Sequence, residues 1–269
     1  MGLPLAQPPV AGATVARIAA GARSIDDDRV AVEAPVAFVY NCRSHAVMMA
    51  TPADLEDFAV GFSIAEGIVA GPGEIRSVRV APRGPGFSLS IQVPEARAGA
   101  LESRQRGLAG RTGCGLCGIA EIEQALRPLP VLGDGPVLPA AALAAALAAL
   151  PPAQQLNRQT GAMHAAALGD ADGRLLVVRE DVGRHNALDK MIGAAARQRL
   201  DPAGGFVVVT SRCSMEMVQK TVSFGARVLV AISGPTSLAI ELAERSNLTV
   251  AGFARGGRLS LYSHPERIR

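Results

Sequence analysis

From Thr160 to the C-terminus, short apolar runs alternate with helical patterns, and this alternation limits the possible folds more than any other part of the sequence. The predicted strands cover 175–178, 206–210, 228–232, 249–253 and 259–262, and the predicted helices cover 189–199, 215–224 and 235–245. Short buried strands separated by helices form a sheet with helices packed on it. This half of the chain is therefore predicted to be a layered α/β domain.

The first half of the chain has a different pattern, which predicts a smaller α+β unit. Its predicted strands cover 30–40, 47–49, 75–80 and 87–93. A helix is expected to begin at Thr51-Pro52, since Thr can cap a helix and Pro fits its first turn, and to end near Gly67. We predict three segments: a poorly ordered lead-in over 1–27, the α+β unit over 28–125 and the α/β domain over 126–269.

Composition excludes several classes of protein. Of the 269 residues, 27 are Lys or Arg and 24 are Asp or Glu, so the net charge of +3 does not indicate a nucleic-acid partner. Aromatic residues are only 3%, too few for a base-stacking surface. The longest apolar run, 140–150, spans ~16 Å as a helix, about half of a bilayer core, so no membrane partner is expected. The N-terminus has no basic residue before Arg17, unlike a signal peptide, and we expect a cytoplasmic protein.

The most chemically specific segment is Gly113-Cys114-Gly115-Leu116-Cys117-Gly118. Its two thiols are close enough to share one metal ion or to react with each other, and the glycines leave the sulfur atoms uncovered. Arg111 could stabilise the thiolate, which is the nucleophilic form. Four interpretations remain open: a structural zinc site, which lacks a second spaced pair, a dithiol–disulfide exchanger, a sulfur or acyl carrier, or inert cysteines. The glycine-rich context favours a carrier over zinc.

The other cysteines, Cys42 and Cys213, are expected to be half-buried apolar residues. His164 lies at an expected helix start, where it is a structural residue, a metal ligand, a base or a capping donor. Three polar segments follow predicted strands: 180–186, 210–216 and 233–237. The first is either a salt-bridged helix entrance or a ligand-facing loop. The other two suit an anion, and side by side they would form a polar groove at one edge of the sheet.

The segment Phe253-Ala254-Arg255-Gly256-Gly257-Arg258 has two interpretations. Gly-Gly between strands is typical of a tight β-hairpin. Alternatively, the two arginines bind the phosphates of a nucleotide-like ligand and Phe253 lies beside its ring system.

Seven motifs in order, over more than two hundred residues, resemble the FdhD/NarQ family of formate dehydrogenase accessory sulfurtransferases. They are VYNCRSHAVMMATPADLEDFAVGFSIAEGI, GRTGCGLCG, TGAMHAAAL, EDVGRHNALDK, TSRCSMEMVQK, LAIELAERSNLTV and GFARGGRLSLYSHPERI. The resemblance extends from about Val36 to the C-terminus.

The resemblance implies a sulfur carrier. A cysteine desulfurase would load Cys114 with sulfur as a persulfide, with Cys117 as its companion, for transfer to the bis-molybdopterin guanine dinucleotide cofactor of formate dehydrogenase. The family's cofactor-binding segment matches Phe253, Ala254, Arg255, Gly256, Gly257 and Arg258, and GDP is the expected analogue. The resemblance further implies a homodimer with a small N-terminal unit and a larger, three-layer α/β domain similar to cytidine deaminase. We expect no metal site.

Deaminase chemistry itself is not expected. A zinc deaminase needs a Glu two residues after its first ligand and a later Cys-x-x-Cys pair. Here the residue two positions after His164 is Ala166, and the residue three positions after Cys213 is Glu216. The remaining alternatives are a cofactor-binding chaperone, in which the cysteines only assist, and a zinc protein.

Overall fold

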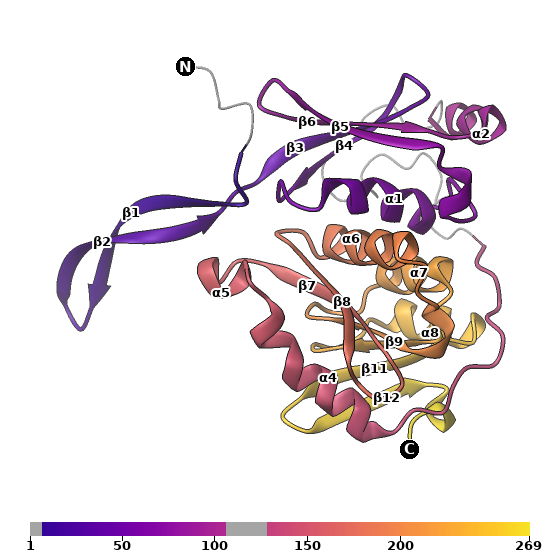
Figure 1. Cartoon of the computed structure of the whole chain (residues 1–269). Coiled ribbons are helices and arrows are strands. Elements are labelled where there is room, and N and C mark those ends of the chain that lie inside the picture. Colours follow the sequence, from indigo (N-terminus) through magenta and orange to yellow (C-terminus); the bar gives the residue numbers. More distant parts are fainter. Residues whose placement is uncertain (1–6, 106–127) are drawn as a thin grey trace.

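The computed structural model describes residues 7–105 and 128–269 (Figure 1). The strands are β1 (Val10–Ala19), β2 (Ala22–Ala31), β3 (Ala34–Tyr40), β4 (Arg43–Ala50), β5 (Ser77–Arg83), β6 (Gly86–Gln92), β7 (His164–Gly169), β8 (Leu175–Asp181), β9 (Phe206–Val209), β10 (Val228–Ala231), β11 (Thr249–Arg255) and β12 (Arg258–Ser263). The helices are α1 (Leu55–Ala65), α2 (Glu95–Gln105), α4 (Ala140–Ala153), α5 (Asn157–Thr160), α6 (Arg184–Arg197), α7 (Met215–Phe224) and α8 (Ser237–Arg245).

The N-terminal unit is a four-stranded sheet in the order β4-β3-β6-β5, with α1 against one face. Alternate residues of β3 are buried, including Val36, Phe38 and Tyr40, as the apolar alternation predicted. Strand β3 pairs antiparallel with β4 and parallel with β6. The predicted α+β unit is confirmed.

The second half is a three-layer α/β domain, as predicted. Its six-stranded sheet has the order β12-β11-β10-β9-β7-β8, with β9, β10 and β11 parallel and β7, β8 and β12 antiparallel to their neighbours. Helices α6, α7 and α8 cover one face, and α4 covers the other (Figure 1). The four-residue strands β9 and β10 are buried along their whole length, which explains their unbroken apolar sequence.

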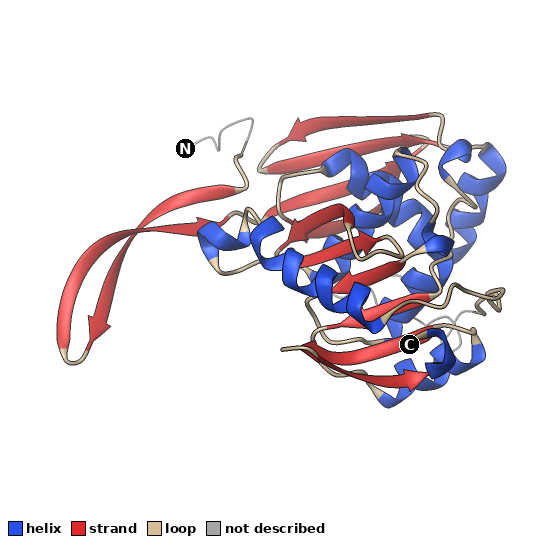
Figure 2. Cartoon of the chain, turned by 60° about the horizontal axis from the view of Figure 1, so that its bottom comes forward, coloured by secondary structure: helices blue, strands red, loops and turns tan. Residues whose placement is uncertain are grey.

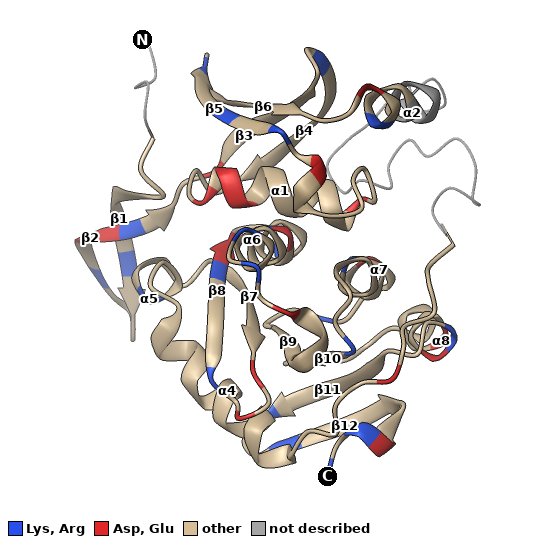
Figure 3. Ribbon diagram, turned by 45° about the vertical axis from the view of Figure 1, so that its right-hand side comes forward, with Lys and Arg blue, Asp and Glu red and all other residues tan. Residues whose placement is uncertain are grey.

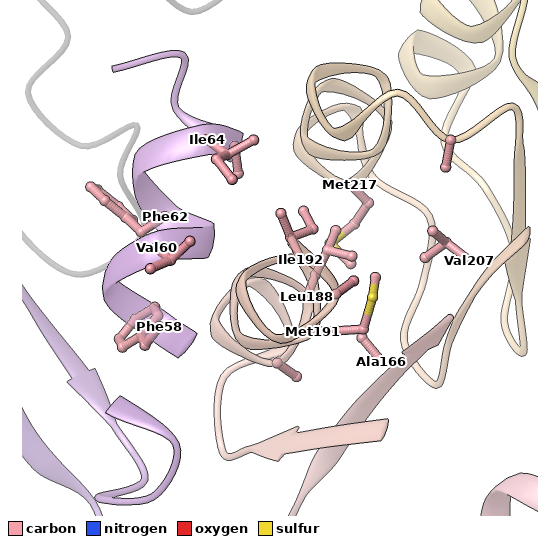
Figure 4. Close-up of a cluster of buried hydrophobic side chains, with 14 of the residues drawn as sticks. Phe58, Val60, Phe62, Ile64, Ala166, Leu188, Met191, Ile192, Val207 and Met217 are labelled. Carbon is pink, nitrogen blue, oxygen red and sulfur yellow. The ribbon is translucent and has the colours of Figure 1, made fainter. Parts of the chain in front are cut away.

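The two halves share one hydrophobic core. In Figure 4, Leu188 and Ile192 extend from α6 toward Met217 and Val207, and Phe58, Val60 and Ile64 belong to α1 on the other side of α6. These residues belong to one continuous buried cluster that also includes side chains of the six-stranded sheet. The four-stranded sheet is therefore not an independently packed domain.

The backbones of α1 and α6 touch where two glycines cross. A Cβ on Gly61 would lie 1.6 Å from the carbonyl oxygen of Asp189, and a Cβ on Gly193 would lie 1.8 Å from that of Asp57. Beside the crossing, the Asp57 carboxylate accepts hydrogen bonds from Arg179 of β8 and Arg197 of α6. Figure 3 shows these acidic and basic segments next to one another. The close contact between α1 and α6 is thus accompanied by ion pairs of Asp57 with Arg179 and Arg197.

Residues 10–31 correct one prediction. The segment 1–27 was expected to be poorly ordered, but β1 and β2 form a regular antiparallel hairpin that extends away from the rest of the molecule (Figure 2). Ion pairs link its strands, such as Arg17 Nη2 to Asp28 Oδ2 at 2.9 Å. None of the side chains of β1 and β2 is buried, so the hairpin lacks the apolar alternation from which strands are predicted. The predicted domain boundary at 125/126 lies outside the described residues.

Thr51 is not a helix cap. The residue before α1 is Asp54 in the left-handed region, with no side-chain cap, and Thr51 is fully buried with its backbone N–H donating to Asp181. Among the residues described, no helix combines the length and apolar character needed to cross a bilayer.

Candidate functional site

The polar turns after β9 and β10 lie side by side, as expected from the sequence. Because β9, β10 and β11 are parallel, their carboxyl ends share one edge of the sheet, and β7 starts there because it is antiparallel to β9. The N–H of Cys213 donates to the carbonyl of Gly234 at 3.2 Å, and that of Thr236 donates to the carbonyl of Cys213 at 3.0 Å. We call this side of the sheet the polar edge; it comprises His164, Arg184, His185, Thr210, Ser214, Glu216 and residues 233–236.

The segment 253–258 forms the hairpin that joins β11 to β12. Gly256 and Gly257 have φ of 59° and 73°, which suits a two-residue hairpin turn and is disfavoured for other residues. Arg255 and Arg258 face each other across the ladder, and both are exposed. The hairpin interpretation is confirmed, and it leaves both guanidinium groups available to a ligand.

Phe253 connects this hairpin to the polar edge. Its φ is 50°, in the left-handed region, and its N–H donates to the carbonyl of Ser233 at 3.1 Å. The ring packs over Gly234, where a Cβ would lie 2.7 Å from the ring's Cζ. The side chain nevertheless remains 48% exposed, whereas the adjacent Ala254 is buried. A half-exposed ring held by strained backbone is suited to stacking on a planar ligand.

His164 begins a strand, not a helix as predicted. It is the first residue of β7, and the alanine-rich run after it is helix-favouring in isolation but is buried in the sheet. Its Nδ1 lies 3.4 Å from Thr210 Oγ1. The pKa of His164 is below its usual value, first because the side chain is partly buried and then because of the positive charges of Arg184 and His185. At neutral pH its imidazole is therefore uncharged.

Glu216 holds His185 at the polar edge. Its Oε2 is 3.2 Å from His185 Nε2 and accepts a hydrogen bond from Ser214 Oγ at 2.9 Å. The hydrogen bond with His185 is the main reason that the pKa of Glu216 is below its usual value, although partial burial opposes it. This carboxylate is thus ionised at neutral pH, and its Oε2 contacts both His185 and Ser214.

A buried network fixes the start of α6. Asp181 Oδ2 accepts from the Thr51 N–H at 2.9 Å and from Lys190 Nζ at 2.6 Å, while Oδ1 accepts from the Gly183 N–H and from Asn186 Nδ2. Asp181 and Lys190 are fully buried. Sequence reasoning missed this pair, since a lysine within a helix normally lies on its solvent face. The segment 180–186 is therefore both a charged helix entrance and a rigid one.

The cysteines divide into two groups. Cys114 and Cys117 lie outside the described residues. Cys42 is exposed in the tight β3–β4 turn, with φ of 68°, and not half-buried as expected. Cys213 is completely buried, which raises the pKa of its thiol to about 12. A thiol in that environment is a poor nucleophile.

Across the described part of the chain, no three His, Cys, Asp or Glu side chains are grouped so as to hold a metal ion. His164 and Cys213, the positions compared with zinc-deaminase ligands, are not brought into such a group. A zinc site that includes the paired cysteines is not tested by this observation.

Comparison with known proteins decides the family. Residues 31–269 match the model of the FdhD/NarQ family. The chain belongs to this family. The match includes the polar edge, the hairpin at 253–258 and the paired cysteines, and it leaves out most of the β1–β2 hairpin.

Relatives within the FdhD/NarQ family extend over nearly the whole chain. Sulfur carrier protein FdhD of Bordetella petrii is 48% identical over 261 residues, covering 96% of this chain and 94% of the relative. The protein of the same name from Xanthomonas euvesicatoria pv. vesicatoria is 53% identical over 255 residues, covering 95% and 91%. A crystal structure from Desulfotalea psychrophila, assigned as a formate dehydrogenase accessory protein, has a TM-score of 0.80 at 29% identity and covers 97% of this chain and 100% of that one. A role as a sulfur carrier in formate dehydrogenase maturation follows.

Proposed function

We propose that the chain accepts sulfur from a cysteine desulfurase as a persulfide on Cys114 and transfers it to the bis-molybdopterin guanine dinucleotide cofactor that formate dehydrogenase uses. The observation that supports this most strongly is the near-full-length similarity to proteins named sulfur carrier protein FdhD. The mechanism needs an accessible thiolate, and the chain has one Cys-x-x-Cys segment for that purpose.

Cys114 suits the loading step better than the other cysteines. Its thiolate attacks the outer sulfur of the donor's persulfide, a new S–S bond forms, and the donor cysteine leaves as a thiolate, so no external oxidant is needed. In the sequence, Cys114 is flanked by Gly113 and Gly115, which have no side chain to hinder a bulky donor or acceptor, and the cation of Arg111 would favour the thiolate. Cys213 is too deeply buried for such an attack. Cys117 is the neighbouring thiol that could attack the persulfide during release.

The polar edge and the 253–258 hairpin are the proposed binding site for the guanine dinucleotide part of the cofactor. The exposed ring of Phe253 is available for stacking on a planar ring system, and the paired Arg255 and Arg258 can donate to phosphate oxygens. GDP is the appropriate probe. We expect GDP to bind the full chain, and the double variant Arg255→Ala/Arg258→Ala to bind it at least about tenfold more weakly.

The matched control for this experiment is Arg174→Ala. Arg174 is exposed in the turn between β7 and β8, at the opposite end of the strands, so its loss should leave GDP binding unchanged. Unchanged binding by the double variant would remove the basis for this cofactor site.

Maturation of formate dehydrogenase separates a carrier from a chaperone. A strain lacking its own family member would be complemented with the wild-type chain, Cys114→Ser or Cys42→Ser. A carrier requires the thiol, so Cys114→Ser should abolish formate dehydrogenase activity and Cys42→Ser, on an exposed turn, should retain it. If Cys114→Ser supports most of the activity, the chain is a cofactor-binding chaperone. The chain is further proposed to act as a homodimer.

A further inference from the structure

One arginine at the polar edge has a buried donor atom that lacks a hydrogen-bond acceptor. Arg184 starts α6, and its Nε is shielded from solvent without a hydrogen-bond acceptor; it is the one such buried side-chain atom in the described residues. Glu216 is close enough to interact with the Arg184 charge, but its Oε2 already accepts from Ser214 and contacts His185. Buried polar atoms normally have a hydrogen-bond partner, so this one indicates a missing ligand.

The surroundings of Arg184 favour an anion as that ligand. His164 begins β7 directly opposite Asp181, the last residue of β8, and Arg184 and His185 follow within four residues of Asp181, so the three residues lie at the same end of the sheet. The same end of the sheet carries the first turns of α6 and α7, and neither helix has a side-chain N-cap. Their free N–H groups add donors to those of the side chains. A metal cation is disfavoured because Arg184 would repel it, and this cluster forms no metal-binding group.

The site is rigid before any ligand binds. Asp181 ties the Gly183 N–H and the Asn186 amide to buried Lys190 and Thr51. Asn186 Nδ2 also donates to the carbonyl of Met49 at 2.8 Å, which links this turn to β4. The start of α6 is therefore held from two sides, and Arg184 loses little backbone freedom when an anion binds.

We propose that Arg184, with His185 and His164, forms a second phosphate-binding subsite on the polar edge, which contacts the diphosphate group of the bound dinucleotide together with Arg255 and Arg258 of the hairpin. The guanidinium fork supplies the Nε donor that now lacks an acceptor, and the start of α6 supplies backbone N–H donors. The identity of the ligand as a guanine dinucleotide rests on the proposed function, whereas the affinity for a phosphate anion does not.

Isothermal titration of the full chain with inorganic pyrophosphate tests the subsite directly. We expect saturable binding by the wild type, binding about ten- to a hundredfold weaker in Arg184→Gln, and an intermediate loss in Arg184→Lys, which keeps the charge but not the fork. Arg174→Gln, an exposed arginine at the far end of the strands, should bind like the wild type. Circular dichroism and thermal unfolding without ligand would show that each variant is folded.

Two outcomes would overturn the subsite: no saturable binding of pyrophosphate by the wild type, or equal affinity in the wild type and folded Arg184→Gln. Should Arg184→Gln not fold, His185→Gln provides the second test, with weaker binding expected and unchanged binding contradictory. Failure of the sulfur-carrier function is a separate result, since Cys114→Ser would then support maturation while pyrophosphate binding still depended on Arg184.

Discussion

Replacing Gly61 with alanine would test whether the α1–α6 crossing joins the two halves of the molecule. The added Cβ would lie 1.6 Å from the Asp189 carbonyl oxygen and 2.6 Å from the Gly193 nitrogen, both backbone atoms that cannot rotate away. Ordinary contact begins near 3.4 Å, so the helices must separate by roughly 1.8 Å, and shifts of this size forfeit much of the dispersion between packed atoms.

Overpacking of a core costs about 1–3 kcal/mol, and this contact belongs at the upper end because backbone must move. Alanine recovers about 1 kcal/mol of helix propensity. The net loss in the free energy of unfolding is therefore about 2 kcal/mol, measured by urea denaturation followed by circular dichroism.

Gly99→Ala is the matched control for Gly61→Ala. Gly99 is an exposed position within α2 where a new Cβ would meet nothing within 4 Å, so the same substitution should stabilise the chain by about 0.5–1 kcal/mol. Opposite signs at the two glycines would support the crossing. A Gly61→Ala variant as stable as the wild type would refute the reasoning.

Two further experiments test the buried Lys190–Asp181 pair and the burial of Cys213. Lys190→Met leaves the Asp181 carboxylate buried without its cation and should lower the free energy of unfolding by about 3–5 kcal/mol in urea denaturation. The double variant Asp181→Asn/Lys190→Met should lose less stability than the two single variants added together, and strict additivity would argue against a coupled pair. In the folded chain at pH 8, iodoacetamide should modify Cys42 and spare Cys213, because a pKa of about 12 leaves about one Cys213 thiol in ten thousand as thiolate. Both cysteines should be modified after unfolding in urea. Rapid labelling of Cys213 in the folded chain, measured by peptide mass spectrometry, would contradict its burial.

Much of the second half of the chain could be predicted because its strands and helices are encoded locally. The apolar run 206–210 became β9 over Phe206–Val209, and 215–224 is the helix α7 as predicted. Gly-Gly at 256–257 predicted the tight turn, since few other residues adopt its φ values. The strand ends then meet at one sheet edge for topological reasons, so the two polar turns were expected as neighbours.

The features that were missed depend on contacts distant in the sequence. The burial of Lys190 needs Thr51 and Asp181 from other elements, and no local pattern signals it. His164, Arg184, His185 and Glu216 were each within a segment singled out in the sequence but were not assigned to a site, because their convergence requires the strand order of the sheet. The β1–β2 hairpin was missed because neither of its faces is buried, so its sequence lacks the alternation of apolar and polar residues that predicts a strand.

The central claim, that Cys114 becomes a persulfide, is tested most directly by mass spectrometry of the chain after incubation with a cysteine desulfurase and free cysteine. We predict that the peptide containing Cys114 gains the mass of one sulfur atom, that a reducing agent removes it, and that Cys114→Ser prevents it. Sulfur found on Cys42 instead, or no sulfur on the chain while formate dehydrogenase is still matured, would contradict the account.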